Sequence, residues 1–387
     1  MSERDLFSSR VPSLENTNPF MAKAQERRAT DPDFLNLIET NPTQAGLIFE
    51  SVPSLPMSPT YDPDPRGLAS ARKAVAEYYG PHVDPDDIVL TASTSEAYSF
   101  LFKLLGDSED EVLVPSPSYP LFEHLTMLEG LVPKTYALGY TGRRWTLDFD
   151  TLQGPRSKRS RALVVVHPNN PTGSYLNTHE IERLGGLTGE LPLIVDEVFF
   201  DYPEPELPFT PVRIADHHRE SLVFSLGGLS KLCSLPQAKL AWIRVSGPDE
   251  PKRAALERLA FIADAYLSVS TAIQDAAPLL LENRFSIQRR IRERISRNAA
   301  CLKDAIRSTS SLIERAREGG WYAVLELPPG WSDEAFALAL LEEGVLVHPG
   351  YFYDFEEENL IVTSLLTPET GWEKGIKTVA ACAGRNA

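Results

Sequence analysis

The chain has 387 residues, of which 42% are hydrophobic and 24% are charged, a composition typical of a globular protein long enough for two domains. Asp and Glu number 54 against 38 Lys and Arg, which gives a formal net charge of −16. Phosphate backbones and anionic membranes repel such a chain, so we expect neither a nucleic-acid partner nor a membrane partner.

The sequence shows no pattern of a targeting segment or a metal site. Residues 1–20 contain no apolar run of the length of a secretory signal, and apolar runs such as 162–166 are too short to span a bilayer. The cysteines, Cys233, Cys301 and Cys382, are odd in number and widely spaced, which predicts no disulfide framework and favours the cytoplasm. The seven histidines show no ligand spacing, so we predict no metal site.

Short apolar runs alternate with helical patterns through the middle of the chain, after a Pro-rich arm at residues 1–30. This alternation is typical of an α/β fold with a mostly parallel sheet, in which ligands bind beyond the carboxyl ends of the strands. The predicted strands span residues 87–91, 111–115, 162–166, 193–197, 221–226 and 240–245, and predicted helices span residues 95–106 and 118–130.

A smaller α+β unit is predicted toward the C-terminus. A long charged helix at residues 285–308 leads into a helix at residues 332–344 and strands at 321–328, 345–350 and 359–366. We therefore expect an arm at residues 1–30, a large domain at 51–285, and a small domain formed by residues 31–50 and 286–387.

The segment "TASTSEAY", Thr91 to Tyr98, places hydroxyl side chains where a predicted strand passes into a helix. Ser93, Thr94 and Ser95, together with the free amides of a helix N-terminus, could cradle a phosphate. The alternative is a simple helix cap with Glu96 in the first turn, and in isolation that interpretation is preferred.

Two further segments place polar side chains after buried strands. In "HPNNPTG", residues 167–173, a tight turn holds the Asn170 amide at a strand end, while His167 is expected to shape the turn rather than to react. In "LIVDEVFFDYP", residues 193–203, Asp196 ends a buried strand, and a buried carboxylate requires a cation or a hydrogen-bond donor beside it.

Lys231 lies among small and apolar residues in "SLGGLSKLCSLPQAKLAW", with Lys239 eight positions later. An ammonium group in such surroundings is costly unless it is neutralised or made covalent. Taken alone, the surroundings of Lys231 favour a structural role for this residue. Cys233 is interpreted as a small packing residue. Together, however, a phosphate cradle, a buried carboxylate, an amide and an interior lysine are the groups that pyridoxal phosphate requires.

These motifs, in this order, resemble those of the class I/II aminotransferases, pyridoxal-phosphate enzymes of the aspartate aminotransferase fold. The resemblance extends from "ETNPT" near residue 40 to "SLLTPE" at residues 364–369. It implies a large cofactor-binding domain with a mostly parallel, seven-stranded sheet flanked by helices, a smaller α+β domain, and a homodimer. It also implies pyridoxal 5′-phosphate as the cofactor, with an amino donor and a 2-oxo acid as the small-molecule partners.

The resemblance assigns a role to individual residues. Lys231, in "GLSK", corresponds to the catalytic Schiff-base lysine, and Asp196 and Asn170 correspond to the partners of the pyridine nitrogen and the phenolic oxygen. The remaining cofactor contacts that it implies are Tyr119, which stacks on the ring; Ser93, Thr94, Ser95, Ser230 and Lys239, which bind the phosphate; and Tyr61, which reaches the phosphate of the neighbouring subunit.

The sequence departs from the family pattern at four positions. Phe199 replaces a tyrosine that donates to the phenolic oxygen, Gly228 replaces a serine, and Lys239 replaces a phosphate-binding arginine, which loses the bidentate fork. Val362 occupies the position of the arginine that clamps the substrate carboxylate. Asn170 and the backbone amides of residues 43–46 are then the alternative carboxylate donors.

Three functions are compatible with these motifs. The first is transamination, and the second is a pyridoxal-phosphate-dependent β-elimination that cleaves a C–S bond on the same scaffold. The third is a ligand-sensing module, which is disfavoured because no basic domain precedes residue 31. The fate of the substrate amino group separates the first two functions.

Overall fold

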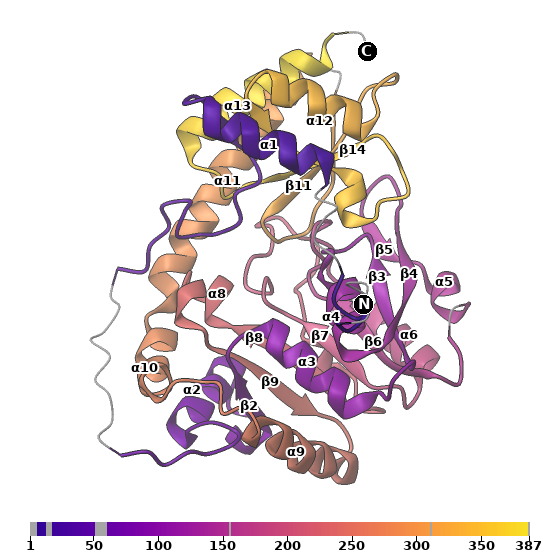
Figure 1. Ribbon diagram of the computed structural model, residues 1–387, viewed down its shortest axis with the longest axis vertical. Coiled ribbons are helices and arrows are strands. Elements are labelled where there is room, and N and C mark those ends of the chain that lie inside the picture. The colour runs from indigo at the N-terminus through magenta and orange to yellow at the C-terminus, as the bar shows by residue number, and fades with distance from the viewer. Residues whose placement is uncertain (1–5, 13–17, 51–59, 155, 310–311, 386–387) are drawn as a thin grey trace.

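The computed structural model describes residues 6–12, 18–50, 60–154, 156–309 and 312–385. One part of the molecule is built on a large sheet and another on a smaller sheet, and the helix α11 (Arg284–Thr309) runs from the first part to the second (Figure 1). Within the described residues, no helix is both long and apolar enough to cross a membrane.

The large sheet has eight strands in the order β2-β9-β8-β7-β6-β3-β4-β5. The pairs β4/β3, β3/β6, β6/β7 and β7/β8 are parallel, whereas β9 is antiparallel to both of its neighbours and β5 is antiparallel to β4. The strands are β2 (Ile88–Thr91), β3 (Glu111–Ser116), β4 (Val132–Tyr140), β5 (Trp145–Leu147), β6 (Ser160–Val166), β7 (Leu193–Asp196), β8 (Val223–Gly228) and β9 (Ala241–Ser246).

The α/β architecture with a mostly parallel sheet agrees with the prediction, but the sheet has eight strands rather than seven. The periodicity indicated neither β4 nor the short edge strand β5. Pro133 and Gly139 interrupt the β4 pattern, and both residue types are tolerated near the edge of a sheet, where fewer hydrogen bonds depend on them.

Helices cover both faces of the large sheet because its strands alternate their buried side chains. Val112 and Val114 of β3 face a core that includes residues of α3, α4 and α9, whereas Leu113 faces a second core with residues of α5, α6 and α7. The helices of this part are α2 (Ala69–Tyr79), α3 (Thr94–Leu105), α4 (Leu121–Glu129), α5 (Phe149–Gln153), α6 (Thr178–Thr188), α7 (Ile214–His217), α8 (Leu229–Leu232), α9 (Asp249–Asp264) and α10 (Thr271–Glu282), with short 3₁₀ turns η2 (Pro85–Asp87) and η3 (Pro236–Ala238).

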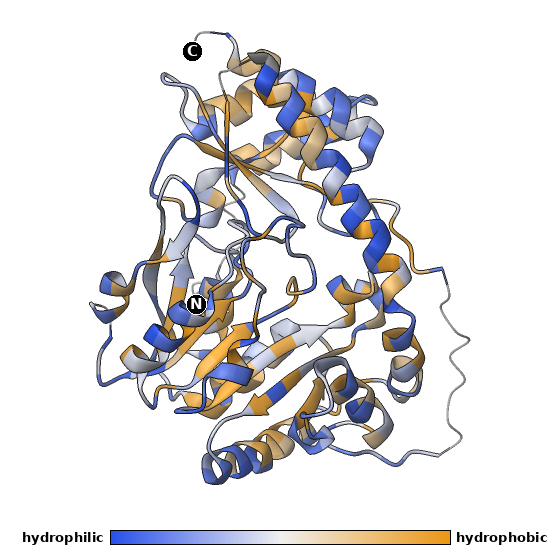
Figure 2. Ribbon diagram, turned by 180° about the vertical axis from the view of Figure 1, so that it is seen from behind, coloured by the Kyte–Doolittle hydropathy of each residue, from blue (hydrophilic) through white to orange (hydrophobic). Residues whose placement is uncertain are grey.

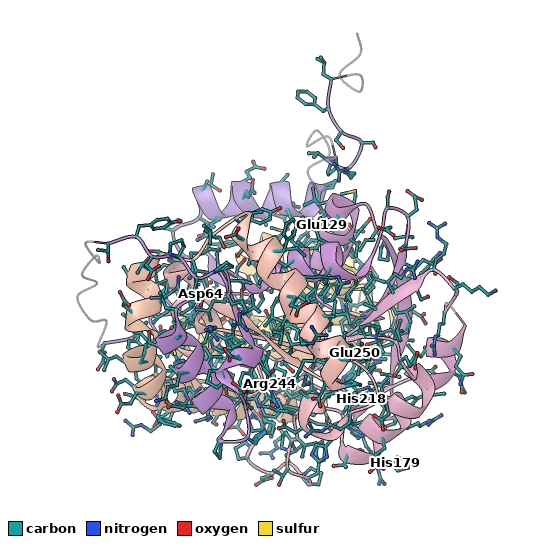
Figure 3. The ribbon with its side chains drawn as sticks, turned by 90° about the horizontal axis from the view of Figure 1, so that it is seen from below. Asp64, Glu129, His179, His218, Arg244 and Glu250 are labelled. Atoms are coloured by element: carbon teal, nitrogen blue, oxygen red, sulfur yellow. The ribbon has the colours of Figure 1, made fainter. Side chains whose placement is uncertain are left out.

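Hydrophobic residues are concentrated on the strands of the large sheet, while the surrounding helices carry both hydrophobic and hydrophilic residues (Figure 2). Seen from below, charged and polar side chains such as Glu250 of α9 and His179 of α6 lie on the outer surface of the helices (Figure 3). This distribution is expected for helices that bury one face against a sheet.

The smaller sheet is antiparallel, in the order β10-β11-β14-β13. N-terminal residues join this part, since β1 pairs with β12 and α1 packs on α12. Its elements are α1 (Pro19–Thr30), β1 (Leu35–Asn36), β10 (Ile313–Arg315), β11 (Tyr322–Glu326), α12 (Asp333–Glu342), β12 (Val345–Leu346), β13 (His348–Pro349), η4 (Gly350–Tyr353), β14 (Leu360–Ser364) and α13 (Glu369–Ala383).

The N-terminal arm expected at residues 1–30 contains the helix α1. The Asn18 side chain accepts hydrogen bonds from the backbone N–H of Phe20 and Met21, and Pro19 occupies the first helical position. Phe20 is buried in the core, so α1 is held by packing as well as by its cap.

The Asn-Pro-Thr-Gly turn after β6 depends on Gly173. Its φ of +72° lies in the left-handed region, and a Cβ at this position would lie 2.3 Å from the carbonyl oxygen of Gly319. Any other residue would therefore combine backbone strain with a clash against a second segment of backbone.

We expect Gly173→Ala to lower the free energy of unfolding by about 2 kcal/mol or more, because both penalties act together. The matched control is Gly186→Ala in the middle of α6, where a Cβ would meet nothing within 4 Å and φ is not positive. That variant should be more stable by about 0.5–1 kcal/mol. Urea unfolding followed by far-ultraviolet circular dichroism measures both, and equal stabilities would contradict this account.

Candidate active site

A cavity of about 200 Å³ lies at the carboxyl ends of the parallel strands, where α/β folds bind ligands. Strands β3, β6, β7 and β8 each lead into a segment that lines it. Seven of the predicted site residues line this cavity: Thr94, Ser95, Tyr119, Asn170, Asp196, Phe199 and Lys231.

Lys231 lies in α8, directly after β8, and its amine has few partners. Nζ donates to the Thr40 carbonyl oxygen at 3.3 Å and lies 5.2 Å from the centre of the Trp321 ring. Burial lowers the pKa of Lys231 to about 8, against the opposing effect of the Asp196 charge. The amine can therefore lose its proton near neutral pH, as a nucleophile or a base must.

Asp196 ends β7, as predicted, and its carboxylate is held from two sides. Oδ2 accepts a hydrogen bond from Tyr98 Oη at 3.1 Å, and Oδ1 accepts one from the Val198 N–H at 3.1 Å. Burial raises the pKa of Asp196 to about 6, although both hydrogen bonds and the Lys231 charge act in the opposite direction. The donors that a buried carboxylate requires are therefore present.

The two asparagines of the turn after β6 have different surroundings. Asn169 holds the turn, because its Nδ2 donates to Pro117 O at 3.3 Å and its Oδ1 accepts from Thr172 Oγ1 at 2.9 Å. Asn170 Oδ1 is buried and has no hydrogen-bond partner. A buried acceptor left without a donor is costly, which indicates that a ligand supplies the missing group.

His167 has a structural environment, in agreement with the expectation. Its Nε2 lies 3.0 Å from Val212 O, and its Nδ1 accepts from the Leu176 N–H at 3.2 Å. Burial lowers the pKa of His167 to about 4, so the ring is neutral and connects two loops.

The hydroxyl groups at the start of α3 divide into two kinds. Ser93 caps the helix, since its Oγ accepts from the Glu96 N–H at 3.1 Å while Glu96 Oε2 accepts from the Ala92 N–H at 2.7 Å. Thr94 and Ser95 line the cavity. The capping interpretation therefore applies to Ser93, whereas the two adjoining residues line the cavity.

Three other predicted residues also lie outside the cavity lining. Ser230 lies in α8 beside Lys231, and Lys239 is exposed after η3 with a φ of +54°. Tyr61 is 77% exposed and lines a separate hollow together with Ser268. Within one chain, these side chains do not join the cluster around Lys231.

The departures from the family pattern have clear structural counterparts. Phe199 is buried and packs edge-on against Trp321 with ring centres 5.2 Å apart. Val362 is buried within β14 opposite Val324, and no arginine is among the described residues that line the cavity. Tyr322, from β11, lines the cavity instead.

Three of the four backbone amides of residues 43–46, which were expected to be able to bind a carboxylate, already have acceptors within the turn, so the expectation stays open only for Gln44. The Thr43 N–H donates to Asn41 Oδ1 at 3.1 Å, the Ala45 N–H donates to Asn41 O at 3.0 Å, and the Gly46 N–H donates to Thr43 O at 3.1 Å. The turn satisfies these donors itself, so they are not available to a ligand.

Sequence reasoning missed three residues that bring polar side chains to the cavity: Tyr98, Thr40 and Tyr322. A signal for Tyr98 existed, because it lies three positions after Ser95 on the same helix and so faces the same side. Thr40 and Tyr322 come from distant parts of the chain, and no local pattern indicates them.

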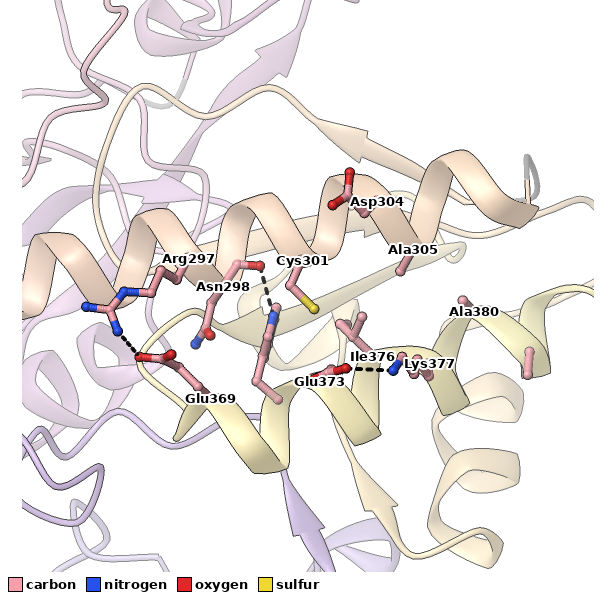
Figure 4. Close-up of a pocket in the computed structure, with 12 residues that line it drawn as sticks. Arg297, Asn298, Cys301, Asp304, Ala305, Glu369, Glu373, Ile376, Lys377 and Ala380 are labelled. Carbon is pink, nitrogen blue, oxygen red and sulfur yellow. Dashed lines mark hydrogen bonds and ion pairs between the residues drawn. The ribbon is translucent and has the colours of Figure 1, made fainter.

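A larger groove of about 740 Å³ lies between α11 and α13, far from the predicted residues in the sequence (Figure 4). Its charged rim is internally paired, with Arg297 on Glu369 at 2.8 Å and Lys377 on Glu373 at 2.7 Å. It contains none of the predicted site residues, and the described part of the chain has no cluster of three or more potential metal ligands here or elsewhere.

Comparisons with known proteins agree with this geometry. Residues 61–370 match the family model for aminotransferase class I and II. An alanine aminotransferase of Mycobacterium tuberculosis is 27% identical over 335 residues, which cover 84% of this chain and 72% of that protein. The S-alkyl-thiohydroximate lyase of Arabidopsis thaliana is 27% identical over 224 residues, or 56% of this chain and 48% of that protein.

The fold is also that of solved aminotransferase structures. An alanine aminotransferase from Pyrococcus furiosus aligns with a TM-score of 0.86 at 23% sequence identity, over 98% of this chain and 100% of that chain. Fold and cavity therefore define an enzyme of the pyridoxal-phosphate-dependent type. The chain belongs to the class I and II aminotransferases.

The residues of the cavity fit the cofactor of this family. Asn170 Oδ1 is an acceptor without a donor, Asp196 is a buried acid with a raised pKa, and Lys231 is an amine with a lowered pKa. In pyridoxal phosphate, the phenolic O–H can donate to this oxygen, while the ring nitrogen and the aldehyde are the groups complementary to the acid and the amine.

Asp196 should destabilise the protein that lacks its cofactor. Because its pKa is raised in the folded state, the stability linked to this group is fully present below its ordinary pKa of 3.8 and is lost as the pH rises through about 6. We compare the free energy of unfolding of Asp196→Asn with that of the wild type. This difference should shift in favour of Asp196→Asn by at most about 3 kcal/mol as the pH rises from 4.5 to 7.5.

Urea unfolding of the cofactor-free proteins at the two pH values measures this gain. The control is Asp275→Asn, which changes an exposed carboxylate on α10 and should show no difference that grows with pH. A constant difference between Asp196→Asn and the wild type across the range would show that the Asp196 carboxylate is not destabilised by burial.

Proposed function

We propose that this enzyme transfers an amino group between an amino acid or amine and a 2-oxo acid in the cavity around Lys231. The observation that carries the proposal is the convergence of Lys231, Asp196 and Asn170 on one cavity, with shifted pKa values at the first two and an unsatisfied oxygen at the third. Asp196 ends β7, whereas Asn170 and Lys231 follow β6 and β8.

The proposed cofactor contacts follow from the lining of the cavity. Asp196 pairs with the ring nitrogen, Asn170 binds the phenolic oxygen and Tyr119 stacks on the ring, while Thr94 and Ser95 at the start of α3 bind the phosphate. When bound, pyridoxal phosphate supplies an aldehyde that forms a Schiff base with an amine and a ring that withdraws electrons from the substrate Cα.

In this proposal, Lys231 holds the cofactor and also moves protons. Its pKa of about 8 lets Nζ accept and release a proton near neutral pH. The buried Trp321 and Phe199 rings beside the amine exclude water, and the Thr40 carbonyl oxygen orients it. Tyr98 keeps the Asp196 carboxylate pointed into the cavity.

A β-eliminating C–S lyase is the second candidate. It is supported by the similarity to a relative named S-alkyl-thiohydroximate lyase and by the lack of an arginine among the described cavity residues. Both reactions use the same cofactor contacts, so they differ only in whether the enzyme retains the amino group.

We further propose a homodimer that works in the cytoplasm. Tyr61 is 77% exposed and lies apart from the cavity of its own chain, as expected for a residue that reaches the phosphate site of a partner. Ser93, Ser230 and Lys239 complete the proposed phosphate contacts. All three cysteines are free, which suits a reducing compartment.

The reaction is tested by the visible spectrum of the cofactor-loaded protein. A productive amino donor should bleach the visible cofactor band, and a 2-oxo acid should restore it. Lys231→Ala should lower turnover at least about a hundredfold, because it removes the proton-transfer group. The control Lys158→Ala removes an exposed lysine and should behave like the wild type.

The same experiment identifies the alternatives. If the band persists while ammonia and pyruvate accumulate from a β-substituted amino acid, the enzyme is a β-eliminating lyase. If neither the wild type nor Lys231→Ala acquires a band with added pyridoxal phosphate, the proposed cofactor site is wrong.

The proposed contact of Tyr61 with the cofactor phosphate of the partner subunit is tested with Tyr61→Phe. Loss of one hydrogen bond to a charged phosphate should raise the dissociation constant of the cofactor about tenfold. Fluorescence titration measures the affinity for the cofactor, and sedimentation velocity measures the oligomeric state. Tyr61→Phe should not dissociate the dimer. A monomeric wild type, or an unchanged affinity, would contradict the proposed role of Tyr61.

A further inference from the structure

A second cavity of about 630 Å³ adjoins the cofactor cavity, and the two share Tyr119 and Phe122 in their walls. It lies between the large-sheet part and the turn η4 of the smaller part, since α4, β4 and η4 all contribute to it. We call this cavity the distal chamber. The polar and charged lining residues that define it are Ser118, Tyr119, Glu123, Lys134, Tyr351 and Asp354.

Ser118 gives the chamber an unsatisfied polar group. It is 3% exposed, and its Oγ has no hydrogen-bond partner. Its backbone N–H donates to Tyr353 O at 2.9 Å, so the position of the residue is fixed from the other side of the chamber. A buried hydroxyl group without a partner indicates that a ligand atom completes its hydrogen bonding.

Two exposed acidic residues, Glu123 on α4 and Asp354 after η4, line the chamber. Partial burial, together with the charge of Glu123, raises the pKa of Asp354. The Asp354 backbone is fixed, because its carbonyl oxygen accepts from Ser116 Oγ at 2.9 Å. Lys134 of β4 also lines the chamber. Its charged lining residues are therefore two carboxylates and one lysine, which leaves one net negative charge.

Aromatic rings line the same chamber. Tyr119 and Tyr351 are 47% and 36% exposed, and Tyr351 Oη accepts from the Asn18 side chain at 3.4 Å. The negative faces of such rings attract ammonium and guanidinium groups. Carboxylates, accessible aromatic rings and an unpaired hydroxyl group are together the groups that bind an organic cation.

We propose that the distal chamber binds the far end of the amino donor and that this end is an ammonium or guanidinium group. This inference rests on the proposed transamination and names the substrate class of that site: basic amines or basic amino acids. A donor with a far carboxylate would place a third negative charge beside Glu123 and Asp354. Among its described lining residues, the cofactor cavity itself offers Lys231 as the sole cation.

Binding is tested first, with two probes that cannot be transaminated. n-Butylguanidinium and n-butylurea have nearly the same shape, but only the first is charged. Calorimetry on the cofactor-loaded wild type should show at least tenfold tighter binding of n-butylguanidinium. The double variant Glu123→Gln/Asp354→Asn should bring the two affinities to within about threefold, whereas Glu182→Gln, an exposed carboxylate on α6, should leave the ratio unchanged.

Two results would overturn the chamber as a cation site. One is equal binding of both probes by the wild type. The other is tighter binding of n-pentanoate than of n-butylguanidinium, abolished by Lys134→Met, which would show that the chamber takes an acidic group.

Turnover then links the chamber to the reaction. The wild type should have at least a tenfold higher kcat/KM for L-ornithine than for L-norvaline, which lacks the far amine, and the double variant should lose that preference through KM. If the protein aminates a 2-oxo acid but prefers L-glutamate, the chamber proposal is wrong while the transamination stands. If the guanidinium binds as expected but no donor reacts, the transamination fails and the chamber is not a donor subsite.

Discussion

The burial of two opposite charges at one edge of the large sheet is the constraint on which the rest of the site depends. Asp196 ends β7, and Lys231 lies shortly after the neighbouring parallel strand β8. The register of these two strands therefore helps to set the distance between the two side chains. Desolvation brings their pKa values to about 6 and about 8, closer together than in water. This costs stability in the protein without its cofactor, and it leaves a carboxylic acid and an amine that both exchange protons near neutral pH. Such a pair is typical of catalytic sites rather than of a packed core.

The remaining elements hold this pair in place. Tyr98, from the first turns of α3, donates to Asp196, while the Ser93–Glu96 cap fixes the start of that helix. Asn169 satisfies the turn after β6, and this leaves the side-chain oxygen of Asn170 free for a ligand. The cavity is closed by segments from outside the large sheet, since Thr40 comes from the N-terminal region and Tyr322 from β11. The site is therefore complete only when the smaller part packs against the larger one.

In the proposal made here, the far end of the substrate and the cofactor occupy two adjoining cavities. The residues that line the cofactor cavity include those that the family resemblance assigns to the cofactor, whereas Phe199 and Val362 depart from the pattern that it implies. The smaller part contributes the Tyr322 side chain to the cofactor cavity and Tyr351 and Asp354 to the distal chamber, and it contributes no arginine to the described lining of either cavity. The proposed preference for a basic donor therefore rests on the charge of the chamber and needs no change in the catalytic groups.

The sequence by itself determined which residues end the parallel strands, because apolar runs followed by polar residues are a local signal. For this reason Asp196, Asn170 and Lys231 could be assigned to one edge of an α/β sheet without coordinates. The tertiary structure decided what surrounds them. The bond from Tyr98 to Asp196 and the positions of Thr40 and Tyr322 depend on contacts between segments far apart in the chain. The amides of Thr43, Ala45 and Gly46 were misjudged because a turn that satisfies its own donors can have the same sequence as one that offers them. Strands β4 and β5 escaped detection because pairing at a sheet edge tolerates residues that break the apolar pattern. Local order thus identifies the reactive groups, while long-range packing sets their hydrogen bonds, their pKa values and the shape of the space between them.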